Sequence, residues 1–279
     1  MNYPLWVFAL TFITAIAPKA SMAGMLATDV SGKAEIIGKG PVSTLAQIAD
    51  GSRLQLSAGA TLVAVDLSSG REFILTGANT YIISSAGPKT LDGNLVQSKA
   101  LPVNNLKEVR VAPGKLAQAT LVMRGSPATR LPVLLSPLRT SVISVLPELK
   151  WESVEGATNY RLEIMKLDGS LVWATVTTGS MASIPEGRAL ETGVSYSWRV
   201  EANGPSGKIS DSSSRFSVAS KDAIESLKLL APAPDASFSR KVLFATQLQE
   251  AGAVQEAKEL WKSLARERPD DAVLLEFTK

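Results

Sequence analysis

Short runs of β type separated by glycine turns fill most of this 279-residue sequence, and they limit its fold more than any other feature. Arg53–Leu56 alternates apolar and polar residues, as a half-buried strand does, whereas Thr61–Asp66 is more uniformly apolar, as a central strand would be. Residues 193–202 alternate cleanly as well. Turn signals recur about every 8–12 residues, a spacing typical of β-sandwiches and barrels. The sequence therefore predicts a mainly β protein.

Cysteine and histidine are both absent from the sequence. Their absence excludes a disulfide framework, a thiol nucleophile and a Ser-His-Asp triad, and it removes the commonest transition-metal ligand. Paired carboxylates or a Ser/Lys dyad remain possible, but no motif has catalytic spacing. We therefore predict no enzyme, no cofactor, and no catalytic, cofactor-binding or metal-binding residue. The excess of basic over acidic residues, 29 − 26 = 3, is too small to indicate nucleic acid binding.

The N-terminus has the form of a cleavable signal peptide. Residues 5–17 are apolar and too few to cross a bilayer core of about 30 Å as a helix. Ser21 and Ala23 are the small residues at positions −3 and −1 of a cut after Ala23, although no Lys or Arg precedes the apolar run. The alternative is a buried N-terminal strand or helix. We predict a signal peptide over residues 1–23 and a periplasmic or secreted protein with no membrane span after its removal.

The first unit, residues 24–127, carries a characteristic order of turns and strands. Its pieces are residues 49–54 (ADGSRL), 59–62 (GATL), 70–77 (GREFILTG) and 81–83 (YII). This order resembles the FecR-like periplasmic domain. The resemblance implies a periplasmic binding or assembly domain, not a transmembrane signalling regulator.

Two motifs in the β-rich region resemble functional sites but are better explained as structural features. Residues 38–40 (GKG) lack the spacing and the strand-to-helix context of a phosphate loop. Asp50-Gly51 and Asp168-Gly169 suggest paired catalytic aspartates, but Asp-Gly is also a strong hairpin-turn signal, and we predict two turns.

A basic stretch runs from residue 99 to residue 150. Its basic residues are Lys99, Lys107, Arg110, Lys115, Arg124, Arg130, Arg139 and Lys150. They face only two acidic residues, Glu108 and Glu148. Such a stretch could contact an acidic glycan or phosphates, but such charges more often form the solvated faces of strands.

The second unit, residues 130–219, has the clearest pattern in the chain. Trp-x-x-Val-x-Gly-Ala-x-x-Tyr-x-Leu-x-Ile over residues 151–164, with Tyr-x-Trp-x-Val over residues 196–200, is similar to fibronectin type III. The resemblance implies an immunoglobulin/fibronectin-like sandwich with Trp151, Tyr160 and Trp198 in its core. Trp173 lies on a middle strand, and we do not assign it to the core. The sandwich fold itself indicates no particular function.

The C-terminal part has helical periodicity. Lys221–Leu230 predicts a helix, and a Pro-rich break completes a helix-and-linker segment over residues 220–234. Residues 239–250 and 254–268 predict two more helices, and their spacing over residues 235–279 resembles a single tetratricopeptide repeat. A lone unit of this family implies either a cap packed on the sandwich or a docking piece for the helices of a partner.

Together these patterns predict a non-catalytic periplasmic or cell-envelope binding or scaffold protein. It would recognise another envelope protein or an envelope glycan such as peptidoglycan through its β domains, and dock a partner through its helices. One alternative is a carboxylate-dependent envelope glycan hydrolase, which needs two acidic residues roughly 5–9.5 Å apart. The other is a purely structural spacer. No binding-site residue follows from the sequence.

Overall fold

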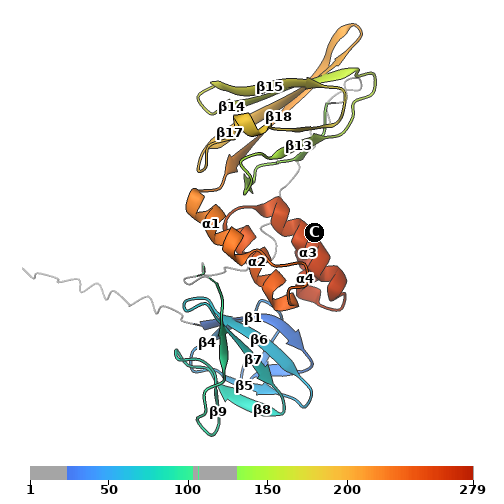
Figure 1. Ribbon diagram of the computed structural model, residues 1–279. Helices are drawn as coiled ribbons and strands as arrows, with labels where there is room; N and C mark the ends of the chain where they lie inside the picture. Colours follow the sequence, from blue (N-terminus) through green and yellow to red (C-terminus); the bar gives the residue numbers. More distant parts are fainter. Residues whose placement is uncertain (1–23, 103–105, 107–130, 279) are drawn as a thin grey trace, which may run out of the picture.

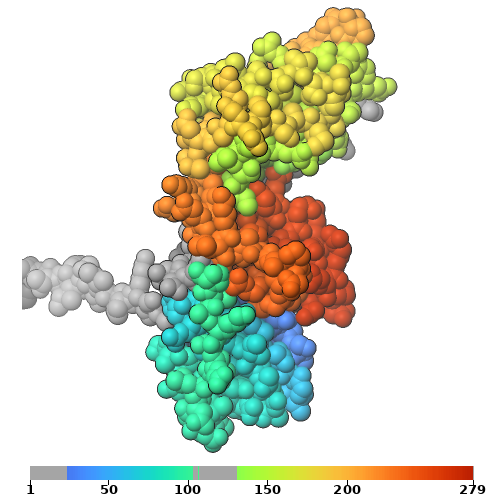
Figure 2. Space-filling model, in the orientation of Figure 1, coloured from blue at the N-terminus to red at the C-terminus, as the bar shows by residue number. Residues whose placement is uncertain are grey.

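The computed structural model describes residues 24–102, 106 and 131–278, and it confirms a mainly β protein with helices at its C-terminal end. Two β units lie at opposite ends of the molecule, and the helices lie between them (Figure 1). Figure 2 shows the same order as three consecutive bodies of atoms. The chain runs from the first β unit to the second and returns to the middle.

The first β unit consists of two five-stranded antiparallel sheets. One has the order β10 (Ser98–Ala100), β7 (Arg71–Thr76), β6 (Thr61–Asp66), β1 (Gly24–Ser31), β4 (Gln47–Ala49). The other has the order β3 (Gly40–Pro41), β2 (Ala34–Ile36), β5 (Arg53–Leu56), β8 (Asn79–Ile82), β9 (Lys89–Thr90).

Strand β6 lies at the centre of its sheet, as its apolar sequence predicted. Leu62 and Ala64 point into the core between the two sheets, whereas Val65 belongs to a second core on the outer face. On β1, Met25 and Leu26 divide in the same way. These central strands are apolar on both faces because both faces are covered.

The second β unit is a sandwich of a three-stranded and a five-stranded sheet, as in fibronectin type III-like folds. The smaller sheet has the order β11 (Leu134–Ser136), β13 (Glu148–Trp151), β16 (Met181–Ser183). The larger has the order β12 (Ser141–Val142), β18 (Gly207–Val218), β17 (Ser195–Gly204), β14 (Asn159–Lys166), β15 (Leu171–Thr177). A short 3-10 helix, Glu186–Arg188, precedes β17.

The aromatic core of the sandwich was predicted correctly. Trp151, Tyr160 and Trp198 are buried, and the rings of the first two meet edge to face with centroids 5.4 Å apart. Trp198 Nε1 donates a hydrogen bond to the Pro137 carbonyl at 2.9 Å. Trp173 is only partly buried.

The last strand of the sandwich is longer than its apolar pattern indicates. That pattern covers only residues 215–218, whereas β18 begins at Gly207. Its first half is rich in serine and lacks an apolar pattern, but the turn after β17 fixes an antiparallel register in which Ala202 pairs with Ser210. Backbone pairing with a well-formed neighbour thus extends the strand beyond its own propensity.

Four α-helices follow the sandwich within the described residues: α1 (Lys221–Leu230), α2 (Phe238–Glu250), α3 (Val254–Glu267) and α4 (Ala272–Glu276). Ser220 and Ser237 cap α1 and α2 by accepting hydrogen bonds from the Ala223 and Arg240 amides. Gly252 has φ +77°, the left-handed conformation expected of a glycine at a helix end. The bounds of α1 are those predicted, and the bounds of α2 and α3 differ from the prediction by one residue each.

The helices share one apolar core with the first β unit. Trp261 and Phe277 are buried in it with ring centroids 4.8 Å apart, and Leu26 and Val65 reach it from β1 and β6. The sequence left open a cap on the sandwich or a partner's docking piece, but the apolar helix faces instead cover the outer face of the first sheet. The sandwich is therefore inserted, in sequence, between two parts of one folded body.

A buried polar chain crosses the contact between α2 and the first β unit. Thr28 Oγ1 and Ser239 Oγ lie 2.7 Å apart, and Ser239 Oγ donates to Glu72 Oε1 at 2.8 Å. Apolar contacts are not directional, so they do not by themselves fix where α2 lies on the sheet. These hydrogen bonds are directional and favour one position.

The helices meet the sandwich mainly through hydrogen bonds. Thr140 Oγ1 donates to the Gly252 carbonyl and accepts from the Val254 amide, each at 3.0 Å. Gln255 Oε1 accepts from Ser136 Oγ at 3.1 Å. We call this contact between residues 135–141 and 252–255 the polar joint. The helices thus share an apolar core with one β unit, and they hold the other through the polar joint and through Ile224 of α1, which is buried in the core of the sandwich.

Candidate functional site

A groove of about 360 Å³ lies beside the polar joint, between the sandwich and α3. We call it the joint groove. It contains three carboxylates, those of Glu148, Glu256 and Glu259. Glu148 forms an ion pair with Lys150 at 2.6 Å, and Glu259 forms one with Lys262 at 2.7 Å. Its other lining residues are Ser136, Val142, Ser144, Leu146, Pro147, Lys150 and Gln255.

Glu256 is the largely buried carboxylate of the joint groove. Burial raises its pKa above the ordinary 4.5, and the backbone amides of Glu256 and Ile143 act in the opposite direction. Its Oε2 is enclosed and has no hydrogen-bond partner among the described residues. The carboxyl group is therefore less costly to the folded state when it is protonated.

Substituting Glu256→Gln is expected to stabilise the protein by about 1 kcal/mol at neutral pH, because it removes an under-partnered buried charge. The folded-state pKa lies above the unfolded value near 4.5, so the unfavourable contribution is absent below pH 4.5 and develops as the pH rises through the folded-state pKa. Urea unfolding of both proteins across this pH range measures the difference.

Glu259→Gln is the matched control because it removes a carboxylate from the same groove at an exposed position. We expect a change within about 0.5 kcal/mol for it. A Glu256→Gln protein that is less stable than wild type at neutral pH would show that the charge is needed at this position.

A second groove, of about 460 Å³, lies between β1 and the turn from α3 to α4. We call it the acidic groove. Arg268 Nη2 lies 3.5 Å from Asp29 Oδ2, and the guanidinium group stands 4.4 Å from the centroid of the Phe238 ring. Burial raises the pKa of Asp29; Arg268 lowers it, and Asp271 raises it further. The groove is a junction between the first β unit and the helices, and its cation Arg268 already has a partner in Asp29.

A third groove, of about 470 Å³, lies on the first β unit between β5, β8 and β9. We call it the polar groove. Asn79 Nδ2 donates to the Thr76 carbonyl at 3.2 Å. The side chains of Gln55, Thr80 and Asp92 also line it and have no hydrogen-bond or ion-pair partner within residues 24–102, 106 and 131–278. An amide, a hydroxyl and a carboxylate are thus available to a ligand that offers hydrogen-bond donors and acceptors.

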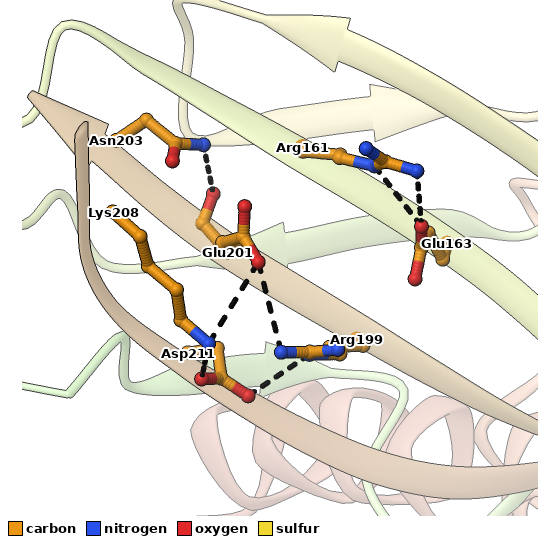
Figure 3. A network of polar contacts seen from close by, with 7 residues as sticks. All are labelled: Arg161, Glu163, Arg199, Glu201, Asn203, Lys208 and Asp211. Atoms are coloured by element: carbon orange, nitrogen blue, oxygen red, sulfur yellow. Dashed lines mark hydrogen bonds and ion pairs between the residues drawn. The ribbon is translucent and has the colours of Figure 1, made fainter.

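The outer face of the larger sandwich sheet carries alternating charges (Figure 3). We call the six residues Arg161, Glu163, Arg199, Glu201, Lys208 and Asp211 the charged face. Arg199 Nε donates to Asp211 Oδ2 at 2.9 Å, and Arg161 Nη2 lies 2.8 Å from Glu163 Oε1. The hydrogen bond from Lys208, followed by that from Arg199, lowers the pKa of Asp211. With three cations and three anions, the face is balanced and largely self-paired.

The structure places the two Asp-Gly motifs in turns, as predicted. Gly51 and Gly169 both have positive φ angles, 79° and 88°. Asp50 and Asp168 are exposed and belong to different β units, so they do not form a pair. The segment at residues 38–40 is also a turn, in which the Lys39 amide donates to the Ile36 carbonyl.

The basic stretch lies only partly within the described residues. Lys107, Arg110, Lys115, Arg124 and Arg130 lie outside them. Lys99 and Arg139 are exposed, and Lys150 is engaged by Glu148. A role for this stretch in binding acidic glycan stays a prediction.

Two further observations concern the described residues as a whole. They contain no group of three or more metal-ligand side chains that could hold a metal ion. None of their helices combines the length and the apolar content needed to cross a bilayer.

No family model matches this sequence, and no curated protein matches it. Among solved structures, CopC from Methylosinus trichosporium OB3b is 18% identical over 31% of this chain and 92% of its own, with a TM-score of 0.24. An Fn3-like protein from Clostridium thermocellum is 14% identical over 34% of this chain and 95% of its own, with a TM-score of 0.25. The twitchin kinase region from C. elegans is 19% identical over 30% of this chain and 15% of its own, with a TM-score of 0.24. Scores this low bear on neither the function nor the partners of the chain.

Proposed function

We propose that the chain is a non-catalytic scaffold protein of the bacterial cell envelope that recognises an envelope glycan or another envelope protein through its β units. The observation that carries the proposal is the position of the helices. They hold the first β unit through an apolar core and the sandwich through the polar joint and Ile224, so the polar groove and the charged face lie on separate units of one chain.

The apolar faces of the helices are occupied within the chain, so we assign recognition to the β units and not to the helices. The polar groove suits a glycan because Gln55, Thr80 and Asp92 present unengaged donors and acceptors to a hydroxyl-rich ligand. The balanced charged face suits the polar surface of a protein partner better than a polyanion.

Export through a cleaved leader is part of the proposal. Cleavage after Ala23 would make Gly24 the first residue of the mature protein. The N-terminal residue of the protein recovered from a periplasmic fraction, determined by mass spectrometry, tests the cut.

Co-sedimentation with isolated peptidoglycan sacculi tests glycan recognition. The wild-type protein should pellet with the sacculi, and a Gln55→Ala/Asp92→Ala protein should bind at least about tenfold more weakly, because two hydrogen-bonding groups are lost. Asp50→Ala is the matched control, since it removes an exposed carboxylate from the same β unit outside the polar groove.

The same experiment separates the alternatives. A glycan hydrolase is favoured by one observation, the juxtaposition of the protonation-prone Glu256 with Glu148 and Glu259. Release of soluble sugar fragments that Glu256→Gln abolishes would establish hydrolysis and contradict a non-catalytic role. A protein that neither pellets nor releases fragments, and that recovers no envelope partner, would instead fit a structural spacer.

A further inference from the structure

Strand β15 is the longest of the edge strands in the described residues. Each of the four sheets has two edge strands. Seven of these eight strands are two or three residues long: β3, β4, β9, β10, β11, β12 and β16. β15 has seven residues. Short edge strands protect a sheet against pairing with another chain, and β15 lacks that protection.

The sequence of β15 lacks two other protections, charge and proline, although the strand has a bulge against β14 between Leu171 and Trp173. Residues 169–185 contain no charged side chain, and Leu171–Thr177 contains no proline. Two large apolar side chains on the strand are exposed, Leu171 by 60% and Val176 by 64%. An unblocked edge of this length presents a row of backbone donors and acceptors to an incoming strand.

We propose that β15 pairs with β15 of a second copy of this chain, antiparallel and centred on Ala174. Because β15 has a bulge between Leu171 and Trp173, the regular pairing is centred on residues 173–175. Trp173 faces the partner's Thr175, and Ala174 faces the partner's Ala174. An aromatic residue opposite a β-branched residue is a pair that stabilises neighbouring strands. The two five-stranded sheets become one continuous sheet.

Charge is compatible with this self-pairing, which argues for a second copy as the occupant. No residue of β15 brings a like charge opposite itself. The nearest charge in the central row is Glu163, which pairs with Ala174 across β14. It would stand three strand spacings from the partner's Glu163, about 14 Å away, beyond the screening length of about 8 Å. Arg161 also neutralises it at 2.8 Å.

The position of β15 leaves room for a second copy. In its sheet β15 is the edge opposite β12, and β12 is the strand that contacts the helices through the hydrogen bond from the Ser141 amide to the Gly252 carbonyl. Figure 1 shows β15 on the side of the sandwich away from the helices. Self-association is therefore independent of the polar joint and of the proposed glycan recognition.

A charge-swap experiment tests both the partner and the register. Sedimentation velocity on the purified protein should show the mass moving from one chain toward two as the concentration rises into the high micromolar range. Pairing through a single strand buries less than a standard interface of about 1,600 Å², so a weak dimer is expected. Ala174→Lys and Ala174→Glu should each weaken dimerisation at least about tenfold, because like charges meet at the axis.

An equimolar mixture of the Ala174→Lys and Ala174→Glu proteins should restore the dimer. Ile74→Lys is the control, since it adds the same charge to an exposed strand position of the other β unit. Circular dichroism and thermal melting establish that each variant is folded. A wild-type protein that stays monomeric at every concentration, or a dimer that survives in both single variants, would overturn the proposal.

Discussion

Replacing Trp261 with alanine is expected to lower the free energy of unfolding of the helices and the first β unit by about 3–5 kcal/mol, the usual cost of deleting a large buried aromatic side chain. Trp261 is fully buried on α3 and stacks against Phe277 of the C-terminal turn. Its Nε1 donates to Gln249 Oε1 at 3.2 Å, so the substitution removes a hydrogen bond as well.

The experiment must show which elements lose stability. Hydrogen exchange measured by mass spectrometry should show faster exchange in α2, α3, β1 and β6 together, because these elements share one core. Strands β14 and β17 of the sandwich should keep their protection. The matched control is Leu275→Ala, an exposed position on α4, with an expected change within about 0.5 kcal/mol. Loss of protection confined to the helices would show that β1 and β6 fold without them.

Replacing Trp198 with alanine is expected to have the reciprocal effect, a loss of about 3–5 kcal/mol confined to the sandwich. Trp198 is fully buried on β17, and its removal also leaves the Pro137 carbonyl without the Nε1 donor. Protection should fall in β14, β17 and β18 and remain in β1 and β6.

Leu167→Ala is the control for the sandwich, because Leu167 is exposed in the turn before β15. If either tryptophan substitution lowered protection in both β units equally, the polar joint would couple them into one cooperative unit. Equal transitions monitored by intrinsic fluorescence and by circular dichroism would report the same coupling.

Local sequence pattern predicted much of the fold, because the spacing of apolar residues within one element is enough to identify it as a helix or a strand. The period of α1 placed Ile224, Leu227 and Leu230 inward, and all three are buried. Alternation did the same for residues 196–202, which lie on β17 with their apolar side chains in the core. The first half of β18 could not be predicted because its pairing with β17, not its own sequence, defines it.

The same patterns could not predict what each face packs against. An apolar helix face is the same in sequence whether it covers the sandwich, a partner or the first β unit, because the hydrophobic effect is not directional. The contact with β1 joins residues more than two hundred positions apart, such as Thr28 and Ser239. A single sequence contains no signal that shows which residues so far apart in the chain are in contact.

The candidate grooves were beyond prediction for a related reason. Glu256 occupies the first turn of α3, where an acidic residue is expected for its favourable interaction with the helix N-terminus. Glu256 is enclosed only because the folded protein places sandwich residues beside it, and these lie more than a hundred positions earlier in the chain. The polar groove likewise combines side chains of separate strands that carry no motif.

The insertion of the sandwich between the two parts of one core has a consequence for the biogenesis of the protein. The first β unit is synthesised before the sandwich, but the residues that cover Leu26 and Val65 come from the helices that follow the sandwich. Until the helices arrive, the outer face of β1 and β6 exposes apolar surface that is prone to aggregation. The first β unit can therefore complete its core only after the sandwich and the helices have been synthesised.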